Sequence, residues 1–160
     1  MNKSIRNAKV KVVNPTSGLP TEQLIADTLR NRNDITKDRS FLRCHIQDWE
    51  RFAKVCDEHF GADVLRFIAM LLAEVLDEVG TSDGQLCHSD NDDFTIIDLP
   101  AVLPRIRERL QQRLTPETLA QDPGYVSIVR KYIDSDKIPM PLKLVTSTIS
   151  ANDFFRTEDR

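Results

Sequence analysis

The stretch that decides the fold is Cys87-His88-Ser89-Asp90-Asn91-Asp92-Asp93-Phe94-Thr95-Ile96-Ile97. Apolar and β-branched residues stand on both sides of a short polar run that is rich in turn-forming residues. This is the pattern of two strands joined by a tight turn. We therefore predict a β-hairpin whose strands cover residues 86–89 and 94–98.

The residues around the hairpin alternate between helical and extended patterns. Apolar side chains recur at the helical period over residues 64–79, and Gly80 supplies a stop. Pro104 lies in the first turn of a later helix, which is a favourable place for proline. The other predicted helices cover residues 24–29, 49–59 (with Gly61 marking the break) and a short segment from Thr115, and further strands are predicted over 41–46 and 142–149. This order predicts an α/β (α+β) fold with one largely antiparallel sheet.

The bulk properties exclude several classes of protein. A chain of 160 residues is long enough for one domain with a real core. The net charge of -3 gives no indication of a nucleic-acid or membrane-surface partner. No apolar run approaches the roughly 18 residues of a membrane span, and no signal peptide is visible. The three cysteines match no zinc or redox motif, so we expect reduced thiols and a cytoplasmic location.

Four segments resemble, in the right order, the motifs of the GGDEF (diguanylate cyclase) family. Residues 14–21, Asn-Pro-Thr-Ser-Gly-Leu-Pro-Thr, are similar to its opening Asp-x-Leu-Thr-Gly-Leu-Pro-Asn, and residues 60–65 resemble its Gly-Asp-x-x-Leu. Residues 90–94, Asp-Asn-Asp-Asp-Phe, resemble the Gly-Gly-Asp-Glu-Phe hairpin, and residues 144–150 are similar to its Ser-Ile-Gly strand without the glycine. The resemblance implies a ferredoxin-like palm with a βαββαβ core, a mainly antiparallel sheet flanked by helices, within residues 14–160. Residues 1–13 are then a linker or an extra strand.

The resemblance also implies which residues stand at the family's metal site. Diguanylate cyclases join two GTP molecules, and Mg²⁺ ions held by carboxylates assist the phosphoryl transfer. The family's first-strand Asp falls on His45, while its hairpin carboxylates fall on Asp92 and Asp93. Because Mg²⁺ prefers hard oxygen ligands, an imidazole is a poor substitute. We expect no metal site and no catalytic residue, with Asp92 as a weak metal candidate.

At the nucleotide-binding positions the departures are larger. The family's guanine-reading Asn and Asp fall on Ala53 and Ala62, and its phosphate-contacting Lys falls on Glu50. Each missing hydrogen-bond partner costs about 1 to 3 kcal/mol of binding. The Gly-Gly turn becomes Asp90-Asn91, whose side chains block a close approach of the backbone to a triphosphate. We therefore do not expect GTP to bind.

Two groups of polar residues leave metal sites open as alternatives. The acidic turn residues Asp90, Asp92 and Asp93 form either a cation site or a solvated hairpin tip, and we favour the tip. A second set of residues forms either a metal cluster or ordinary packed side chains: His45, His88, Cys44 and Cys87. Strand alternation places Cys44 and His45 on opposite faces, which favours ordinary packing.

Two aromatic pairs also allow two interpretations. Trp49 and Phe52 belong either to a partner-binding patch or to a helix packed on the sheet, which we favour. The pair Phe154-Phe155, in an otherwise charged tail, either docks on the domain or is the remnant of a longer chain. The family's product-binding Arg and its final helix have no match in this sequence.

The resemblance and the replacements together lead to a functional hypothesis. The chain is a catalytically inactive, bacterial GGDEF-like domain of cyclic di-GMP signalling that needs no cofactor. It acts by binding a protein, such as a sensor or receiver domain, or another copy of itself. The alternatives are a weak or altered diguanylate cyclase or a GTP-binding regulatory domain, which would use Mg²⁺, and a structural regulatory domain that responds to a neighbouring domain.

Overall fold

The computed structural model describes residues 13–30, 39–55, 57–133 and 142–158. Within them lies one sheet of four strands: β1 (Ser40–Ile46), β2 (Gln85–His88), β3 (Phe94–Asp98) and β4 (Leu144–Ile149). The strands are ordered β2-β3-β1-β4, and every neighbouring pair is antiparallel. This is the strand order of a ferredoxin-like βαββαβ core. The predicted fold class is therefore confirmed.

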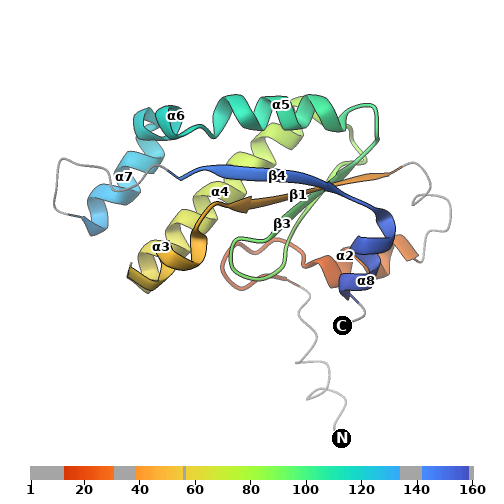
Figure 1. The fold of residues 1–160 in the computed structure, drawn as a ribbon, viewed down its shortest axis with the longest axis horizontal. Coiled ribbons are helices and arrows are strands. Elements are labelled where there is room, and N and C mark those ends of the chain that lie inside the picture. The colour runs from red at the N-terminus through yellow and green to blue at the C-terminus, as the bar shows by residue number, and fades with distance from the viewer. Residues whose placement is uncertain (1–12, 31–38, 56, 134–141, 159–160) are drawn as a thin grey trace, which may run out of the picture.

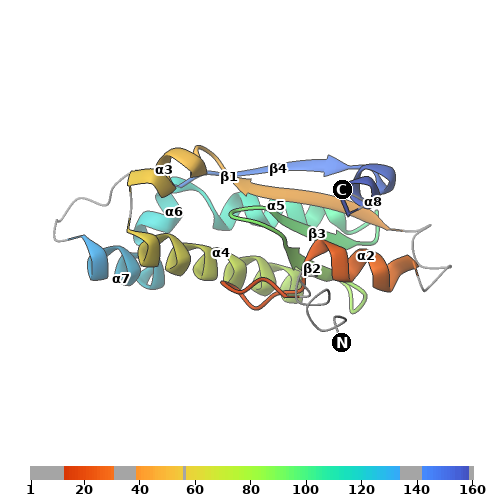
Figure 2. The same ribbon diagram turned by 90° about the horizontal axis from the view of Figure 1, so that it is seen from below.

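Helices connect and cover the strands. In chain order they are α2 (Glu22–Arg30), α3 (Trp49–Val55), α4 (Glu58–Val79), α5 (Leu103–Arg113), α6 (Pro116–Gln121), α7 (Pro123–Tyr132) and α8 (Ala151–Glu158). Figures 1 and 2 show α4 running along the sheet near α5, while α2 and α8 lie together towards one end. No helix in the described ranges is long and apolar enough to cross a membrane.

The side chains of the sheet divide into two apolar clusters, because successive strand residues point to opposite faces. Leu42, Cys44 and Ile46 of β1 belong to the larger cluster, which also contains the buried face of α4. Phe41, the neighbour of Leu42, belongs to the smaller cluster with residues of α2 and with Phe154 of α8. The sheet therefore has helices on both faces, and its C-terminal helix belongs to the smaller cluster.

The junction between α4 and the hairpin is fixed by a buried carboxylate. Asp98, at the end of β3, is fully buried and accepts a hydrogen bond of 2.9 Å from the backbone N–H of Thr81. Its other oxygen accepts a hydrogen bond from the Thr81 hydroxyl. Because Thr81 directly follows α4, this contact sets where the chain leaves the helix and enters β2.

Several predicted boundaries were wrong. The predicted break at Gly61 lies inside α4, which already begins at Glu58 after an N-cap at Asp57. A Cβ at Gly61 would lie 3.9 Å from the indole of Trp49, which is an ordinary van der Waals contact, so Gly61 is an internal residue of the helix and marks no break. The strand predicted over 142–149 begins at Leu144, and the one predicted over 86–89 covers Gln85–His88.

Two helices were not predicted at all. The N-cap of α7 is Asp122, whose side chain accepts hydrogen bonds from the N–H groups of Gly124 and Tyr125, and Pro123 lies in the first turn. α8 carries Phe154, which is fully buried and stacks on Phe41 with ring centroids 4.7 Å apart. The aromatic pair of the tail therefore docks on the domain. The prediction for residues 1–12 lies outside the described residues.

Candidate functional site

A cavity of about 630 Å³ opens where β1 ends and the chain turns into α3, facing the β2–β3 hairpin. Strand β1 places His45 and Ile46 at its wall, the hairpin places Asp92 there, and the turn before α3 and α3 itself contribute the rest. The lining residues are His45, Ile46, Asp48, Trp49, Glu50, Arg51, Lys54 and Asp92. Asp48 sits in the connecting turn with a positive φ of 59°, a conformation that Asp tolerates better than most residues.

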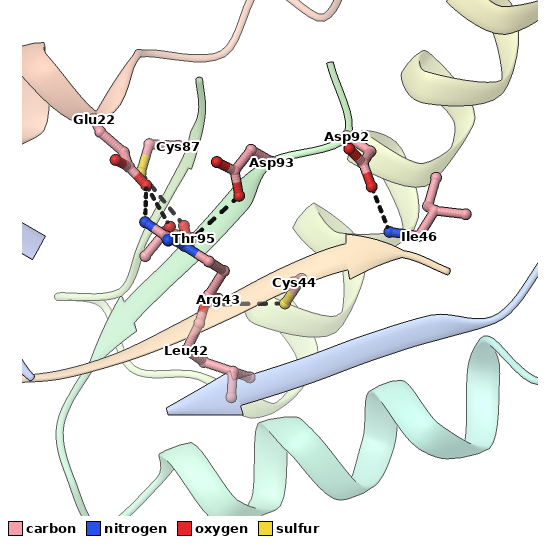
Figure 3. A network of polar contacts seen from close by, with 9 residues as sticks. All are labelled: Glu22, Leu42, Arg43, Cys44, Ile46, Cys87, Asp92, Asp93 and Thr95. Carbon is pink, nitrogen blue, oxygen red and sulfur yellow. Dashed lines mark hydrogen bonds and ion pairs between the residues drawn. The ribbon is translucent and has the colours of Figure 1, made fainter. Parts of the chain in front are cut away.

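Asp92 ties the hairpin to the central strand. One of its carboxylate oxygens accepts a hydrogen bond of 2.8 Å from the backbone N–H of Ile46 (Figure 3). Ile46 is the last residue of β1, and its N–H points towards the hairpin side of that strand. Asp92 therefore extends the β1–β3 pairing by one side-chain contact, and one of its oxygens is already engaged.

Asp93, the next residue, belongs to a different group of charges. Its carboxylate lies 3.6 Å from Nε of Arg43, and Nη2 of Arg43 lies 3.4 Å from the carboxylate of Glu22 in α2 (Figure 3). Glu22 also accepts a hydrogen bond of 2.8 Å from the hydroxyl of Thr95. Partial burial raises the pKa of Asp93 above its usual value, and the positive charge of Arg43 opposes that rise.

The loop before α2 holds the base of the hairpin. The Asn14 side-chain amide donates a hydrogen bond of 2.6 Å to the carbonyl of Ser89, and the His88 N–H donates one of 2.9 Å to the carbonyl of Pro20. The His88 ring lies between Ser17 Oγ, at 2.7 Å from Nδ1, and the carbonyl of Asn91, at 2.6 Å from Nε2. Since the carbonyl can only accept, Nε2 carries the proton and Nδ1 accepts from Ser17. Burial lowers the pKa of His88.

The structure brings some of the sequence-predicted site residues together and separates the others. His45, Glu50 and Asp92 line the same cavity. Ala53 is exposed on α3 and Ala62 is half-buried on α4, and neither lines that cavity. The predicted site is therefore only partly assembled.

The hairpin residues Asp90 and Asn91 do not line this cavity. Both are exposed at the hairpin tip, and Asn91 has a positive φ of 52° as the turn requires. Asp93 turns to Arg43 and is absent from the cavity lining. Asn91 thus supplies the backbone conformation that a glycine would have supplied, but with a side chain added.

Sequence reasoning missed three contributors to the site. Arg51 and Lys54 line the cavity from α3, and Arg43 lies two residues before His45 on the same face of β1. The strand period of two was the signal that would have placed Arg43 beside His45. Nothing in the sequence pairs Arg43 with Glu22, because these residues meet only when α2 packs on the sheet.

The three side chains that the resemblance places at a metal site do not fit Mg²⁺. His45 offers nitrogen where the ion prefers oxygen, Asp92 has one oxygen engaged by Ile46, and Asp93 is held by Arg43. Within the described ranges, no group of three or more His, Cys, Asp or Glu side chains is arranged to hold a metal ion. We therefore derive no metal-assisted step from this site.

The cysteines and the α3 aromatics have structural environments. Burial raises the pKa of Cys44 to about 12 and raises that of Cys87 well above its usual value, so neither thiol is reactive near neutral pH. Cys44 packs in the larger cluster, on the opposite face of β1 from His45. Trp49 and Phe52 are buried against each other, with ring centroids 5.3 Å apart. Both aromatics therefore belong to the packed core, where Phe52 also meets Phe60 of α4, and not to an exposed patch.

Comparison with known proteins places the fold. No family model matches the sequence, and no curated protein matches it. Among solved structures, the chain is similar to the GGDEF domain of DgcB from Caulobacter crescentus in complex with c-di-GMP, with a TM-score of 0.64, 12% identity, and 94% of this chain and 86% of that chain covered.

Two further solved structures are similar. A diguanylate cyclase/phosphodiesterase from Caldicellulosiruptor saccharolyticus gives a TM-score of 0.61 at 12% identity, covering 92% of this chain and 82% of that chain. The diguanylate cyclase SiaD in complex with its activator SiaC, from Pseudomonas aeruginosa, gives a TM-score of 0.56 at 9% identity, covering 98% of this chain and 57% of that chain. At these identities the likeness is one of fold. The strand order, the hairpin and the cavity beside it, together with these neighbours, show that this chain has the fold of a GGDEF domain, that is, of a diguanylate cyclase-like domain.

Proposed function

We propose that this chain is a GGDEF-fold domain that does not make cyclic di-GMP and that acts by binding another protein chain. The observation that carries the proposal is the engagement of Asp92, the candidate metal ligand of the hairpin, by the backbone of Ile46 at 2.8 Å. A carboxylate that completes the strand pairing has to give up that bond before it can bind an ion with both oxygens. In this structure the Asp92 carboxylate therefore fastens the hairpin to β1.

The charges around the cavity support the same proposal. Asp48, Glu50 and Asp92 place three carboxylates where a polyphosphate and its cation would have to enter. Repulsion between like charges disfavours a triphosphate there unless metal ions compensate for it. The family's base-reading positions, Ala53 and Ala62, offer no hydrogen-bonding side chain and lie outside the cavity lining.

Two of the similar structures support a binding role for such a scaffold. One of the similar structures is a diguanylate cyclase in complex with its activator protein, and another carries a coiled coil together with its GGDEF domain. Those observations belong to those proteins. They support the proposal that this fold presents surfaces to a protein partner, such as a sensor or receiver domain, or to a second copy, without nucleic acid, membrane or cofactor.

The direct test is calorimetric titration of the protein with GTP and Mg²⁺, followed by chromatography of the same samples after long incubation at high protein concentration. We expect neither a binding heat nor cyclic di-GMP. Restoring the family residues with His45→Asp, Glu50→Lys, Ala53→Asn and Ala62→Asp provides the matched comparison. Saturable binding of GTP by the unmodified chain, with turnover, would contradict the proposal.

A second candidate, a domain that binds GTP weakly for regulation, is favoured by one observation. Arg51 and Lys54 of α3 both line the cavity and offer positive charge to phosphates. If this candidate is correct, GTP binds in the titration without turnover, and Arg51→Ala with Lys54→Ala abolishes the heat. An unchanged heat in that double variant would place the nucleotide elsewhere.

A further inference from the structure

The outer edge of β4 carries hydrogen-bonding groups that no described residue satisfies. β4 pairs with β1 on one side, and in the described ranges it has no neighbour on the other (Figures 1 and 2). The N–H of Gln47 donates to the carbonyl of Lys143 at 2.8 Å, and these residues are directly opposite in the extension of the β1–β4 register. In an antiparallel pair, hydrogen-bonded positions alternate. The backbone groups of Leu144, Thr146 and Thr148 therefore point away from β1.

The opposite edge of the sheet, formed by β2, is partly covered by the chain itself. β2 has β3 on one side, and the N–H of His88 on its outer side donates to the carbonyl of Pro20 in the loop before α2. A segment of the chain thus occupies part of that edge. No corresponding segment lies along β4 within the described ranges, so β4 is the edge that is open.

The sequence of β4 has none of the usual protections of an open edge. Natural edge strands carry charged residues, prolines or bulges that prevent pairing with another chain. Residues 144–149, Leu-Val-Thr-Ser-Thr-Ile, contain no charge, no proline and no glycine, and the register with β1 is continuous. A strand of this composition is suited to pair with a further strand along its whole length.

Two cavities lie beside the same edge, between β4 and α5. One, of about 470 Å³, is lined by Thr148, Leu103 and Glu108 among others, and the second, of about 280 Å³, is lined by Leu144, Thr146 and Leu114 among others. Gln111 of α5 lines both. The space therefore follows β4 over most of its length, on the face to which Leu144, Thr146 and Thr148 point.

We propose that this edge binds a second copy of the chain, β4 against β4, in an antiparallel pair with a two-fold axis at Thr146. In this register Thr146 is opposite Thr146 of the second copy, and Leu144 is opposite Thr148. All three outward-pointing residues of each copy then find a partner, which gives about six backbone hydrogen bonds. A shift of the axis by one residue in either direction leaves outward groups of the strands unpaired.

The chemistry of the edge matches a second copy in particular. A two-fold axis places identical surfaces together, and six uncharged residues meet six uncharged residues with no like charges in opposition. The apolar side chain of Leu144 enters the cavity beside Thr148 of the other copy. The contact is small, so the pair is a weak, reversible dimer.

This inference deepens the binding part of the proposed function, since it names the partner, but its test involves no nucleotide and stands or falls separately. Sedimentation velocity over a range of concentrations measures the dimer dissociation constant of the full chain and of Thr146→Lys and Thr146→Glu. Each variant alone places like charges opposite each other on the axis. We expect each dissociation constant to rise about five- to tenfold.

A mixture of the two variants provides the decisive comparison. If the axis lies at Thr146, Lys and Glu at that position attract each other, and the mixture regains heterodimers at least as tight as the unmodified dimer. Gln121→Lys, which adds the same charge on the exposed end of α6, serves as the control and leaves dimerisation unchanged. Thermal melts of all variants check that each one folds, because a folded variant is needed for the comparison.

Four results would overturn the inference. The first is a chain that stays monomeric at the highest concentration reached. The second is a dimer that Thr146→Lys and Thr146→Glu leave intact, because it then uses another surface. The third is a mixture that forms no heterodimers. The fourth is dimerisation that occurs only after residues 1–12 are removed, because the second copy is then not the occupant of the edge in the full chain.

Discussion

The carboxylate of Asp92 and the backbone N–H of Ile46 are joined by a hydrogen bond of 2.8 Å, so the hairpin turn is fastened to the last residue of the central strand. Both residues line the cavity beside α3. The shape of that cavity therefore depends on a contact that also stabilises the fold. This relationship connects the candidate site to measurable stability.

Removing the acceptor tests the role of Asp92. Asp92→Ala leaves the Ile46 N–H without its partner, and we expect a loss of about 1 kcal/mol in the free energy of unfolding. Asp92→Asn keeps a carbonyl oxygen at the same place and should lose less. Urea denaturation measures both, and Asp77→Ala, an exposed carboxylate on α4, is the control. Equal losses in the Ala and Asn variants would contradict the assigned hydrogen bond.

Arg43 neutralises the buried carboxylate of Glu22, so replacing Arg43 should lower the free energy of unfolding. The side chain of Glu22 is only 5% exposed and lies 3.4 Å from Arg43. Arg43→Met leaves that charge buried without its cation, so we expect a loss of about 3 kcal/mol in stability by urea denaturation.

Two further variants separate this pair from general effects. Arg43→Met combined with Glu22→Gln removes both charges and should recover much of the loss. Arg113→Met breaks a surface pair with Glu74, which is 47% exposed, and should cost less than about 1 kcal/mol. A loss from Arg113→Met as large as that from Arg43→Met would show that burial of Glu22 is not the cause.

Phe154 tests the docking of α8. Its side chain is fully buried and stacked on Phe41, whereas Phe155 is half-buried and meets Phe41 edge-on at 6.3 Å. Phe154→Ala should cost about 3 kcal/mol or more through lost burial and a cavity. Phe155→Ala, the matched control, should cost clearly less. Hydrogen exchange of the β1 amides gives a second readout, since Phe41 belongs to β1.

His88 makes stability depend on pH. Burial lowers the pKa of His88 in the folded state, so the native protein binds fewer protons than the unfolded chain. Its contribution is present above the unfolded value of about 6.5 and is lost as the pH falls below that value towards the folded pKa. His88→Gln removes the proton linkage, so its unfolding free energy should fall less steeply between about pH 6.5 and 5.

The same pair of proteins compared at pH 8 supplies the control for this prediction. There the imidazole is neutral in both states, so any difference in stability reports packing and hydrogen bonding alone. Thermal or urea unfolding at several pH values gives the slopes. Parallel curves for the two proteins across the acidic range would show that His88 does not carry the linkage.

Local patterns were sufficient for the elements that have strong periodicity. The long helix α4, the hairpin and strand β1 were predicted because apolar side chains repeat at the periods that these elements require. The end of α3 and the start of α4 were misplaced because Gly61 was taken as a break, whereas α3 ends at Val55 and Gly61 lies inside α4, after the N-cap at Asp57. α8 was missed because eight residues with Phe154-Phe155 as the apolar pair show too little repetition.

The candidate site shows the same division. The replacements at His45 and Glu50 and the matching carboxylate of Asp92 were visible in the order of residues, and these residues do meet in one cavity. The pairing of Arg43 with Glu22 was not visible, because 20 intervening residues and the packing of α2 on the sheet separate the two positions.

By itself, the sequence determined which periodic segments form and which chemical groups stand at the hairpin and at the end of the central strand, because side-chain identity and spacing act locally. Only the tertiary structure decided that Asp92 bonds to the backbone of Ile46 and that Arg43 forms ion pairs with Glu22 and Asp93. It also decided that, among the residues the structure describes, β4 is an open edge. These outcomes depend on distances between residues far apart in the chain, and such distances are fixed only when the helices and the sheet pack around common cores.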